Sequence, residues 1–309
     1  MAFTGTGQVS SSTGAFEQMA YFALRSNPLY EMIADVRSTA QTHNGASVTF
    51  DIYDNMAAAT GALGEAVDVV PVALGDSTAV VTLVEYGNAV ETTAKLRGTS
   101  FLNVDADAAN IIGYNMVDSL DQVVAAVAAG GTNEILPTGR AATVNIIAGD
   151  TITADQTRTA AAKLRTASAP GFENGNYVGM IHPNVAFDLR SQTAVTDVIA
   201  FQIRQDGQAV RNGSIGTWGG VEFIENPRAH IQAGAGAAGI DVYDTIIAGR
   251  QALAKGFSRA PGFGEQPQIV YGPTTDYLRR FVSVGWYHLC GYGRFREACL
   301  QRVESSSSL

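Results

Sequence analysis

The sequence predicts an α+β fold that is completed by other copies of the same chain. Two long strands within residues 45–94 are followed by no third strand that could cover them. One helix after residue 105 is long enough to act as a spine, and short strands and helices then alternate between residues 132 and 250. Such alternation is typical of a compact α/β domain. An uncovered strand pair beside such a domain indicates an assembly protein.

The strand pair is predicted from apolar residues that recur at every second position of residues 48–52 and of the return segment up to residue 87. This period is typical of strands with one dry face. The connection has a Gly/Ala-rich tip at residues 57–64 and is far too long for a tight turn. Because an isolated two-stranded ribbon is marginal in water, we expect another copy of the chain to cover it.

The strongest helical pattern follows this predicted hairpin. Asp105 or Asp107 would supply the cap and a favourable charge at the helix N-terminus, and Gly130-Gly131 would end the helix. A helix of about 25 residues is about 37 Å long at roughly 1.5 Å per residue. One stripe of apolar side chains is expected to be buried: Ile112, Met116, Leu120, Val123 and Val127.

Shorter elements are predicted on both sides. Residues 1–14 are rich in Gly, Ser and Thr and should form an extended arm, and Asn27-Pro28 should start a helix over residues 29–36. We expect Ser305 to Ser308 to be a soft tail. A closing pair of strands at residues 268–271 and 280–287 is expected around a turn at residues 272–276.

Within the α/β part, residues 144–147 are predicted to be a strand, and Asp150 or Thr153 to open a helix through Leu164. A buried strand is expected at residues 176–181, ended by His182-Pro183 before another helix. A further strand, residues 221–224, should follow Trp218-Gly219-Gly220.

Composition limits the possible functions. The chain has 309 residues, 46% of them hydrophobic and 16% charged, with a net charge of −9. So acidic a chain is not expected to bind nucleic acid through bulk electrostatics. The N-terminus resembles no signal peptide, no membrane span is expected, and we expect synthesis in a cytoplasm with Cys290 and Cys299 unpaired.

The signals for an enzyme are weak. Gly234 to Gly239 has the G-x-G-x-x-G spacing of dinucleotide sites, but no convincing strand precedes it and Arg259, not an acid, lies twenty residues on. The four histidines are scattered, and Asp105 and Asp107 lie where a helix cap needs them. We therefore predict no catalytic, metal-binding or cofactor-binding residues.

The order of parts resembles the Hong Kong 97-type major capsid proteins of tailed bacteriophages, and most of all the family typified by the major capsid protein of phage N-four. The residues that carry this resemblance are 62–71 and 84–88 on the hairpin, Asp105 at the spine helix, 180–183 with Asp188-Leu189, and 215–221. The resemblance implies an N-terminal arm, an extended hairpin called the E-loop, a peripheral domain with the spine helix, and a compact α/β axial domain. The expected boundaries are 1–44, 45–94, 95–135 with 251–309, and 136–250, respectively.

The same resemblance implies a structural subunit of an icosahedral virion capsid. Pentamers and hexamers would enclose double-stranded DNA without sequence-specific binding, after assembly in the host bacterial cytoplasm. A separate scaffolding protein, a portal and a possible decoration protein would be partners, and no membrane would be involved. The prototype of this fold cross-links its subunits covalently through a lysine of the E-loop. The E-loop of this chain has no lysine between residues 46 and 94, so we expect no such cross-link.

Two sets of assembly residues follow from the resemblance. The E-loop would contact a neighbour through Val48, Phe50, Ile52, Leu63, Glu65, Val67, Val69, Val81 and Leu83. The tip of the peripheral domain would contribute Pro273, Thr274 and Asp276 near local three-fold contacts. Two alternatives stay open: an encapsulin-like nanocompartment shell on the same fold, and an α/β enzyme with an oligomerising hairpin.

Overall fold

The computed structural model divides the chain into two compact units. The smaller unit contains residues 87–116 and 269–287, and the larger contains residues 26–86, 117–268 and 288–309. The structure describes residues 29–37, 45–62, 64–65, 68–100, 104–172, 175–191, 214–260, 263–272, 276–278 and 280–309. The predicted N-terminal arm and Asn27-Pro28 lie outside the described residues.

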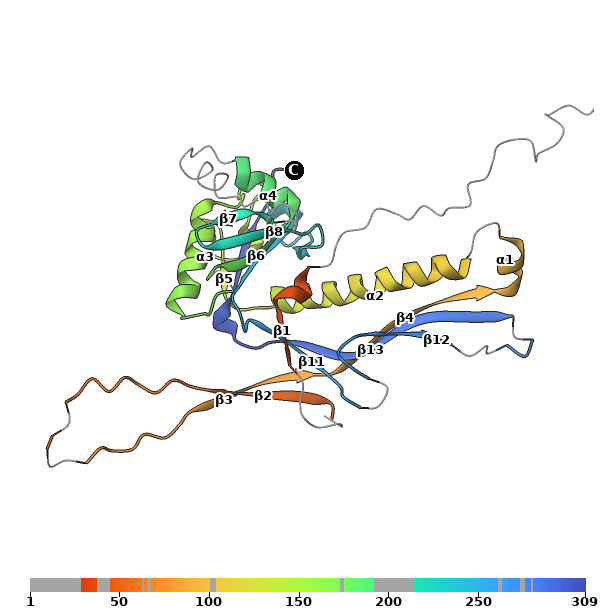
Figure 1. Cartoon of the computed structure of the whole chain (residues 1–309). Coiled ribbons are helices and arrows are strands. Elements are labelled where there is room, and N and C mark those ends of the chain that lie inside the picture. The colour runs from red at the N-terminus through yellow and green to blue at the C-terminus, as the bar shows by residue number, and fades with distance from the viewer. Residues whose placement is uncertain are drawn as a thin grey trace, which may run out of the picture. The chain divides into compact units, whose positions relative to one another are not determined.

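A seven-stranded sheet forms the core of the larger unit. Its strands run in the order β5-β14-β10-β6-β8-β7, and β9 pairs with β10. The helices α3 and α4 lie beside this sheet (Figure 1). The strands are β5 (Glu134–Ile135), β6 (Tyr177–Ile181), β7 (Ser214–Trp218), β8 (Val221–Glu225), β9 (Ile231–Gln232), β10 (Val242–Ala248) and β14 (Leu300–Ser305).

Both helices of this part begin where the sequence predicts. Helix α3 (Ala154–Thr166) starts with a capping box, in which the Thr153 hydroxyl accepts from the Gln156 amide and the Gln156 side chain accepts from the Thr153 amide. Pro183 is the first residue of α4 (Pro183–Ser191), as expected from its preference for that position. The predicted strands at residues 176–181 and 221–224 are confirmed as β6 and β8.

The C-terminus differs from the expected soft tail. Ser305 and Ser306 are buried, and β14 pairs along its length with β10 inside the seven-stranded sheet. Ser308 continues the contact, because its amide donates to the Asp188 carboxylate at 2.9 Å. Residues 300–305 therefore belong to the sheet of the α/β part, although the sequence grouped them with the closing strands.

A five-stranded sheet contains β1 (Ala34–Arg37), β11 (Leu253–Phe257), β13 (Phe281–Arg294) and β12 (Gln268–Tyr271) in that order, and β4 (Val84–Thr93) also pairs with β13. The predicted closing strands are confirmed as β12 and β13. Residues 29–36 are not a helix, because only Tyr30–Ile33 form a 3₁₀ turn (η3) before β1 pairs in parallel with β11. Backbone pairing to a neighbouring strand overrides the helical spacing.

The spine helix is confirmed as α2 (Val104–Ala129), which is followed by Gly130-Gly131. Helix α1 (Ala94–Thr99) precedes it. Asp105 and Asp107 lie inside the first turn of α2, so neither is the N-cap, although both charges favour the helix there. Ile112 and Leu120 are buried as predicted, but further along Val124 and Ala128 are more deeply buried than Val123 and Val127.

The predicted strand at residues 144–147 is a 3₁₀ turn, Thr143–Asn145. Val144 and Ile147 are exposed, and only Ile146 is buried. The Asp150 carboxylate accepts from the Ile147 amide and binds Arg140 at 2.6 Å. These contacts curl the segment, so it has no strand partner.

We predict that Thr153→Ala lowers the free energy of unfolding by about 1 kcal/mol, since the α3 cap is lost. Thr159→Ala is the matched control, because its hydroxyl donates to the Asp155 carbonyl on the exposed face of the same helix. That control should change the free energy by less than about 0.5 kcal/mol. Urea unfolding followed by circular dichroism measures both, and equal losses would contradict the role of the cap.

Candidate assembly surfaces

The expected hairpin is present, but its paired strands span only residues 47–82. Strands β2 (Ser47–Tyr53) and β3 (Asp76–Thr82) pair antiparallel, with Val48 opposite Val81 and Phe50 opposite Ala79. Residues 84–93 form β4, which pairs with β13 instead. In Figure 1 the described residues between Asp54 and Gly75 form a long open loop beyond the paired strands. We call residues 47–82 the hairpin.

One face of the hairpin base is covered by the chain itself. Val48 and Val81 are only 1% and 2% exposed. Val81 packs with Ala254 and Phe295, and the Phe50 ring meets the Phe295 ring edge-on at 5.9 Å. This corrects the expectation for Val48 and Val81: their cover comes from the same chain, so they have no surface left for a neighbour. Phe50, Ile52 and Leu83 are partly buried.

Glycines in β13 make this close packing possible. A Cβ on Gly291 would lie 2.1 Å from the Thr82 carbonyl oxygen, and one on Gly293 would lie 2.8 Å from a methyl of Val81. Both distances are far below van der Waals contact, so only glycine allows the backbones to approach this closely. We call Gly291 and Gly293 the glycine seat.

Beyond the base the hairpin is apolar and uncovered. Val70 is 81% exposed, and further large apolar side chains are also exposed: Tyr53, Met56, Val69, Val72, Leu74 and Val80. Among the described residues between Asp54 and Gly75, no backbone-to-backbone hydrogen bond forms inside the loop. Extended backbone with free donors and acceptors can pair with another chain. Glu65 is exposed here as well, whereas Leu63 and Val67 lie outside the described residues.

All the charged side chains of the hairpin are negative. Residues 47–82 contain five carboxylates and no lysine, arginine or histidine. They are Asp51, Asp54, Glu65, Asp68 and Asp76. A surface that accepts this hairpin must therefore combine apolar contact with a tolerance for negative charge.

The second predicted surface belongs to the smaller unit. Asp276 accepts from the Arg280 guanidinium at 2.7 Å and from the Leu278 amide at 3.2 Å, and these hydrogen bonds lower the pKa of its carboxyl. Asp276 is thus committed to holding the turn, while Tyr277 and Leu278 are exposed beside it. The sequence analysis did not predict Tyr277 and Leu278 as part of this surface. Pro273 and Thr274 lie outside the described residues.

Side-chain hydrogen bonds tie the smaller unit together. The Trp286 indole donates to Asn115 at 3.0 Å, and Asn88 donates to the same amide oxygen at 3.1 Å. The Thr92 hydroxyl lies 3.1 Å from the Asp105 carboxylate. These contacts join β4 and β13 to α2 within this unit.

The glycine-rich segment is not a phosphate site. The amides that a phosphate would need are already used, because Gly236 donates to the Ile240 carbonyl, Ala237 to the Ile146 carbonyl and Gly234 to the Asp241 carboxylate. A strand, β10, follows instead of the helix that a dinucleotide site requires. The segment is a compact turn.

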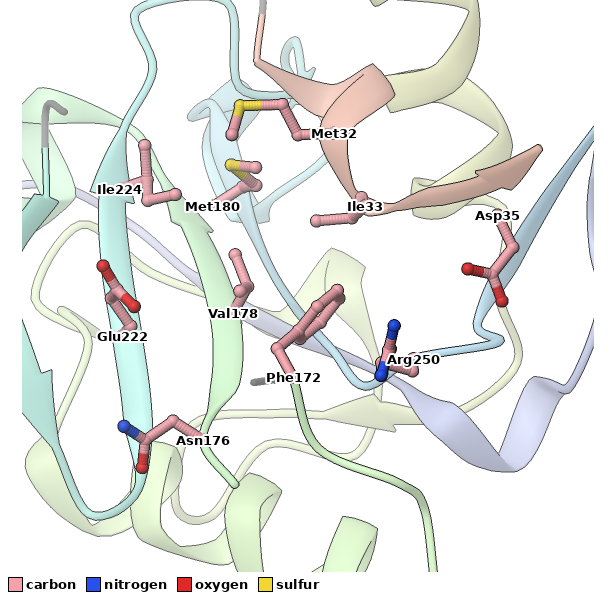
Figure 2. Close-up of a pocket in the computed structure, with 10 residues that line it drawn as sticks. All are labelled: Met32, Ile33, Asp35, Phe172, Asn176, Val178, Met180, Glu222, Ile224 and Arg250. Atoms are coloured by element: carbon pink, nitrogen blue, oxygen red, sulfur yellow. The ribbon is translucent and has the colours of Figure 1, made fainter. Parts of the chain in front are cut away.

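A cavity of about 390 Å³ in the larger unit contains no catalytic arrangement. Figure 2 shows an apolar floor with Asp35 and Glu222 on opposite sides, so the two carboxylates cannot work as a pair. The lining is Met32, Ile33, Asp35, Phe172, Asn176, Val178, Met180, Glu222, Ile224 and Arg250. Within the described part of the chain, no cluster of metal-ligating side chains is found, and no helix is long and apolar enough to cross a membrane.

Comparison with known proteins decides the family. A sequence model of the phage capsid protein family matches residues 13–305. The chain belongs to that family. It is a structural protein of a phage capsid, and the family match favours this over an encapsulin-like compartment. No curated protein matches the sequence.

Solved capsid structures share the fold of this capsid protein. The capsid of Ralstonia phage GP4 matches with a TM-score of 0.80 at 13% identity, over 99% of this chain and 98% of that one. The capsid of the cyanophage P-SCSP1u matches with 0.69 at 17% identity over all of both chains. The acidic stable capsid of Helicobacter pylori bacteriophage KHP30 matches with 0.70 at 11% identity over 99% of each. The predicted Hong Kong 97-type fold is therefore confirmed.

We predict that Gly291→Ala lowers the free energy of unfolding by about 1–3 kcal/mol, because the new methyl forces the hairpin base away from β13. Protease should also cut residues 54–75 faster. Gly113→Ala is the control: the space around Gly113 in α2 is open, and Ala stabilises a helix interior by about 0.5–1 kcal/mol over Gly. The two variants should shift chemical unfolding in opposite directions, and equal shifts would refute the glycine seat.

Proposed function

We propose that this capsid protein assembles into pentamers and hexamers that close an icosahedral shell around double-stranded DNA. Assembly takes place in the host bacterial cytoplasm, with a separate scaffolding protein and a portal. The observation that carries this proposal is the hairpin loop, which exposes Val69, Val70, Val72 and Leu74 and whose described residues form no backbone pairs with one another. A single chain gains nothing from such a segment, whereas a neighbouring subunit can bury it.

The hairpin base gives the loop its direction. Val48, Val81 and the glycine seat fix the paired strands to the chain's own β11 and β13, so the loop is presented to a neighbour from a rigid support. Pre-organisation of this kind reduces the entropy lost on association. Docking of each hairpin on the next subunit then links subunits within a capsomer.

Burial, not covalent chemistry, holds the shell together on this proposal. The hairpin has no lysine that could form an isopeptide bond. Burying a Val side chain contributes roughly 1.5–3 kcal/mol, and several exposed apolar residues repeat in every copy. A decoration protein is a possible further partner at the exposed Tyr277 and Leu278.

Deletion of residues 57–64 tests the role of the loop. We expect shells to disappear, while the subunits keep their circular dichroism spectrum and unfolding midpoint, because the deleted residues contribute nothing to the core of the described chain. Electron microscopy and sedimentation velocity of the deletion variant beside the unchanged chain provide the readout. Normal shells from the deletion variant would count against the loop as an assembly element.

Val70→Asp is a sharper test of the apolar contact. With Val70 81% exposed in the free subunit, the free energy of unfolding should change by less than about 0.5 kcal/mol. Assembly should fail, since the interface would bury an unpaired carboxylate in a segment that is already acidic. Val70→Ile keeps the contact apolar and should assemble normally. If Val70→Asp also assembles normally, then Val70 lies outside the interface.

A further inference from the structure

The sheet that seats the hairpin carries buried polar side chains on its other face. Lys255 of β11 lies opposite Tyr292 of β13, and Phe257 lies opposite Cys290. Because side chains alternate along a strand, Lys255, Cys290, Tyr292 and His288 share one face. Gly256 and Gly291 open toward the hairpin on the other face, where they lie close to Val48 and Thr82.

Lys255 is the central charge of this group. It is only 2% exposed and forms an ion pair with Glu31 of the turn η3. The Tyr292 hydroxyl donates to the same Glu31 oxygen at 3.1 Å. A buried ammonium group is tolerated only when it is paired, so Glu31 holds the start of β1 to the sheet through its charge.

His288 is the member of this group that has an unsatisfied ring nitrogen. It is 3% exposed, and its Nε2 has no hydrogen-bond partner within the described chain. Burial, and then the charge of Lys255, lower the pKa of His288 to about 4. Burial also raises the pKa of Cys290 to about 12 and that of Tyr292 above its usual range. At neutral pH the charges facing His288 are therefore Lys255 and Glu31, which balance.

We propose that Glu31, Lys255, Tyr292 and His288 form an acid-sensitive latch, which holds residues 31–37 on the sheet beneath the hairpin. A proton on His288 adds a second cation to a buried site that has one carboxylate. The site must then open so that water can hydrate the extra charge, and it opens at the strand with the fewest pairing partners. That strand is β1, four residues that pair with β11 alone among the described strands.

Tyr30, directly before Glu31, stays fixed when the latch opens. Tyr30 is fully buried, and its amide donates to the Asp121 carboxylate of α2 at 2.6 Å. Residues 31–37 can therefore loosen while Tyr30 keeps its place. Since β1 leads along the chain into β2, acid alters the support of the hairpin from the side opposite the glycine seat.

The sign of the pH effect follows from proton uptake. The ordinary pKa of a histidine is about 6.5, above the value in the closed latch, so the open state binds the proton first as the pH falls. The latch is complete above about pH 6.5 and weakens down to about pH 4. Asp121 acts in the opposite direction, because burial raises the pKa of its carboxyl and protonation then favours the folded state. Burial also lowers the pKa of His182, so the effects of the two histidines are separated by substituting each one.

Hydrogen–deuterium exchange of unassembled subunits at pH 7 and pH 5, corrected for intrinsic exchange, tests the latch. Protection of the amides of residues 34–37 should fall roughly tenfold in the unchanged chain and stay constant in His288→Gln. His182→Gln is the control and should keep the tenfold loss, since His182 precedes α4. Equal losses in the unchanged chain and His288→Gln, or no loss in either, would overturn the proposal.

A second measurement needs no substitution. The ring of His288, followed by NMR in the unchanged chain, should titrate near pH 4, and a midpoint at or above pH 6.5 would also overturn the latch. Neither experiment involves shells. Failure of the latch is therefore distinguishable from failure of the capsid role, which depends on the hairpin loop.

Discussion

The close approach of the hairpin base to β13 is the contact on which the rest of the structure depends. Without side chains at Gly291 and Gly293, the backbone of β3 can lie almost directly on the sheet. This approach buries Val48 and Val81 inside the chain and leaves the loop beyond them without support. One short contact thus separates the part of the hairpin that is buried within the subunit from the part that we propose for contact with another subunit.

The larger unit contains both a sheet with a complete hydrophobic core and a hairpin loop whose apolar side chains are exposed. Its seven-stranded sheet buries Met180, Phe223, Ile246 and Val303 within the chain. Arg302 in this sheet pairs with Glu134 at 2.8 Å and with the buried Glu304 at 2.9 Å. The described residues of the hairpin loop have neither a core nor such pairs, so their free energy depends on contacts outside the chain.

Local signals predicted most of the elements. Thr153 with Gln156 marked the start of α3, Pro183 marked α4, and alternation around Val48 gave the antiparallel hairpin. Non-local contacts decided the failures. The pairing of β1 with β11 overrode the helical spacing of residues 29–36, and Ser305 and Ser306 are buried only because β10 lies beside them.

The assembly surfaces remain predictions, and the structure shows only which of their residues are exposed. The exposure of Val69 agrees with the predicted surface, but the cover over Val81 comes from Ala254 and Phe295, which are far away in sequence. The spacing Gly291-x-Gly293 inside a strand was an available signal for a close backbone approach. The latch residues could not have been found from sequence, because Lys255 has no local partner and meets Glu31 only in the fold.

The uniformly negative charge of the hairpin affects how free subunits behave before they assemble. Apart from Pro71, the segment Val69-Val70-Pro71-Val72 consists of exposed β-branched residues of the kind that favour cross-β aggregation. Five carboxylates make two free hairpins repel each other, and Pro71 interrupts any continuous ladder of backbone hydrogen bonds. On the proposed assembly route, this repulsion keeps newly made subunits apart while their hairpin loops are still uncovered.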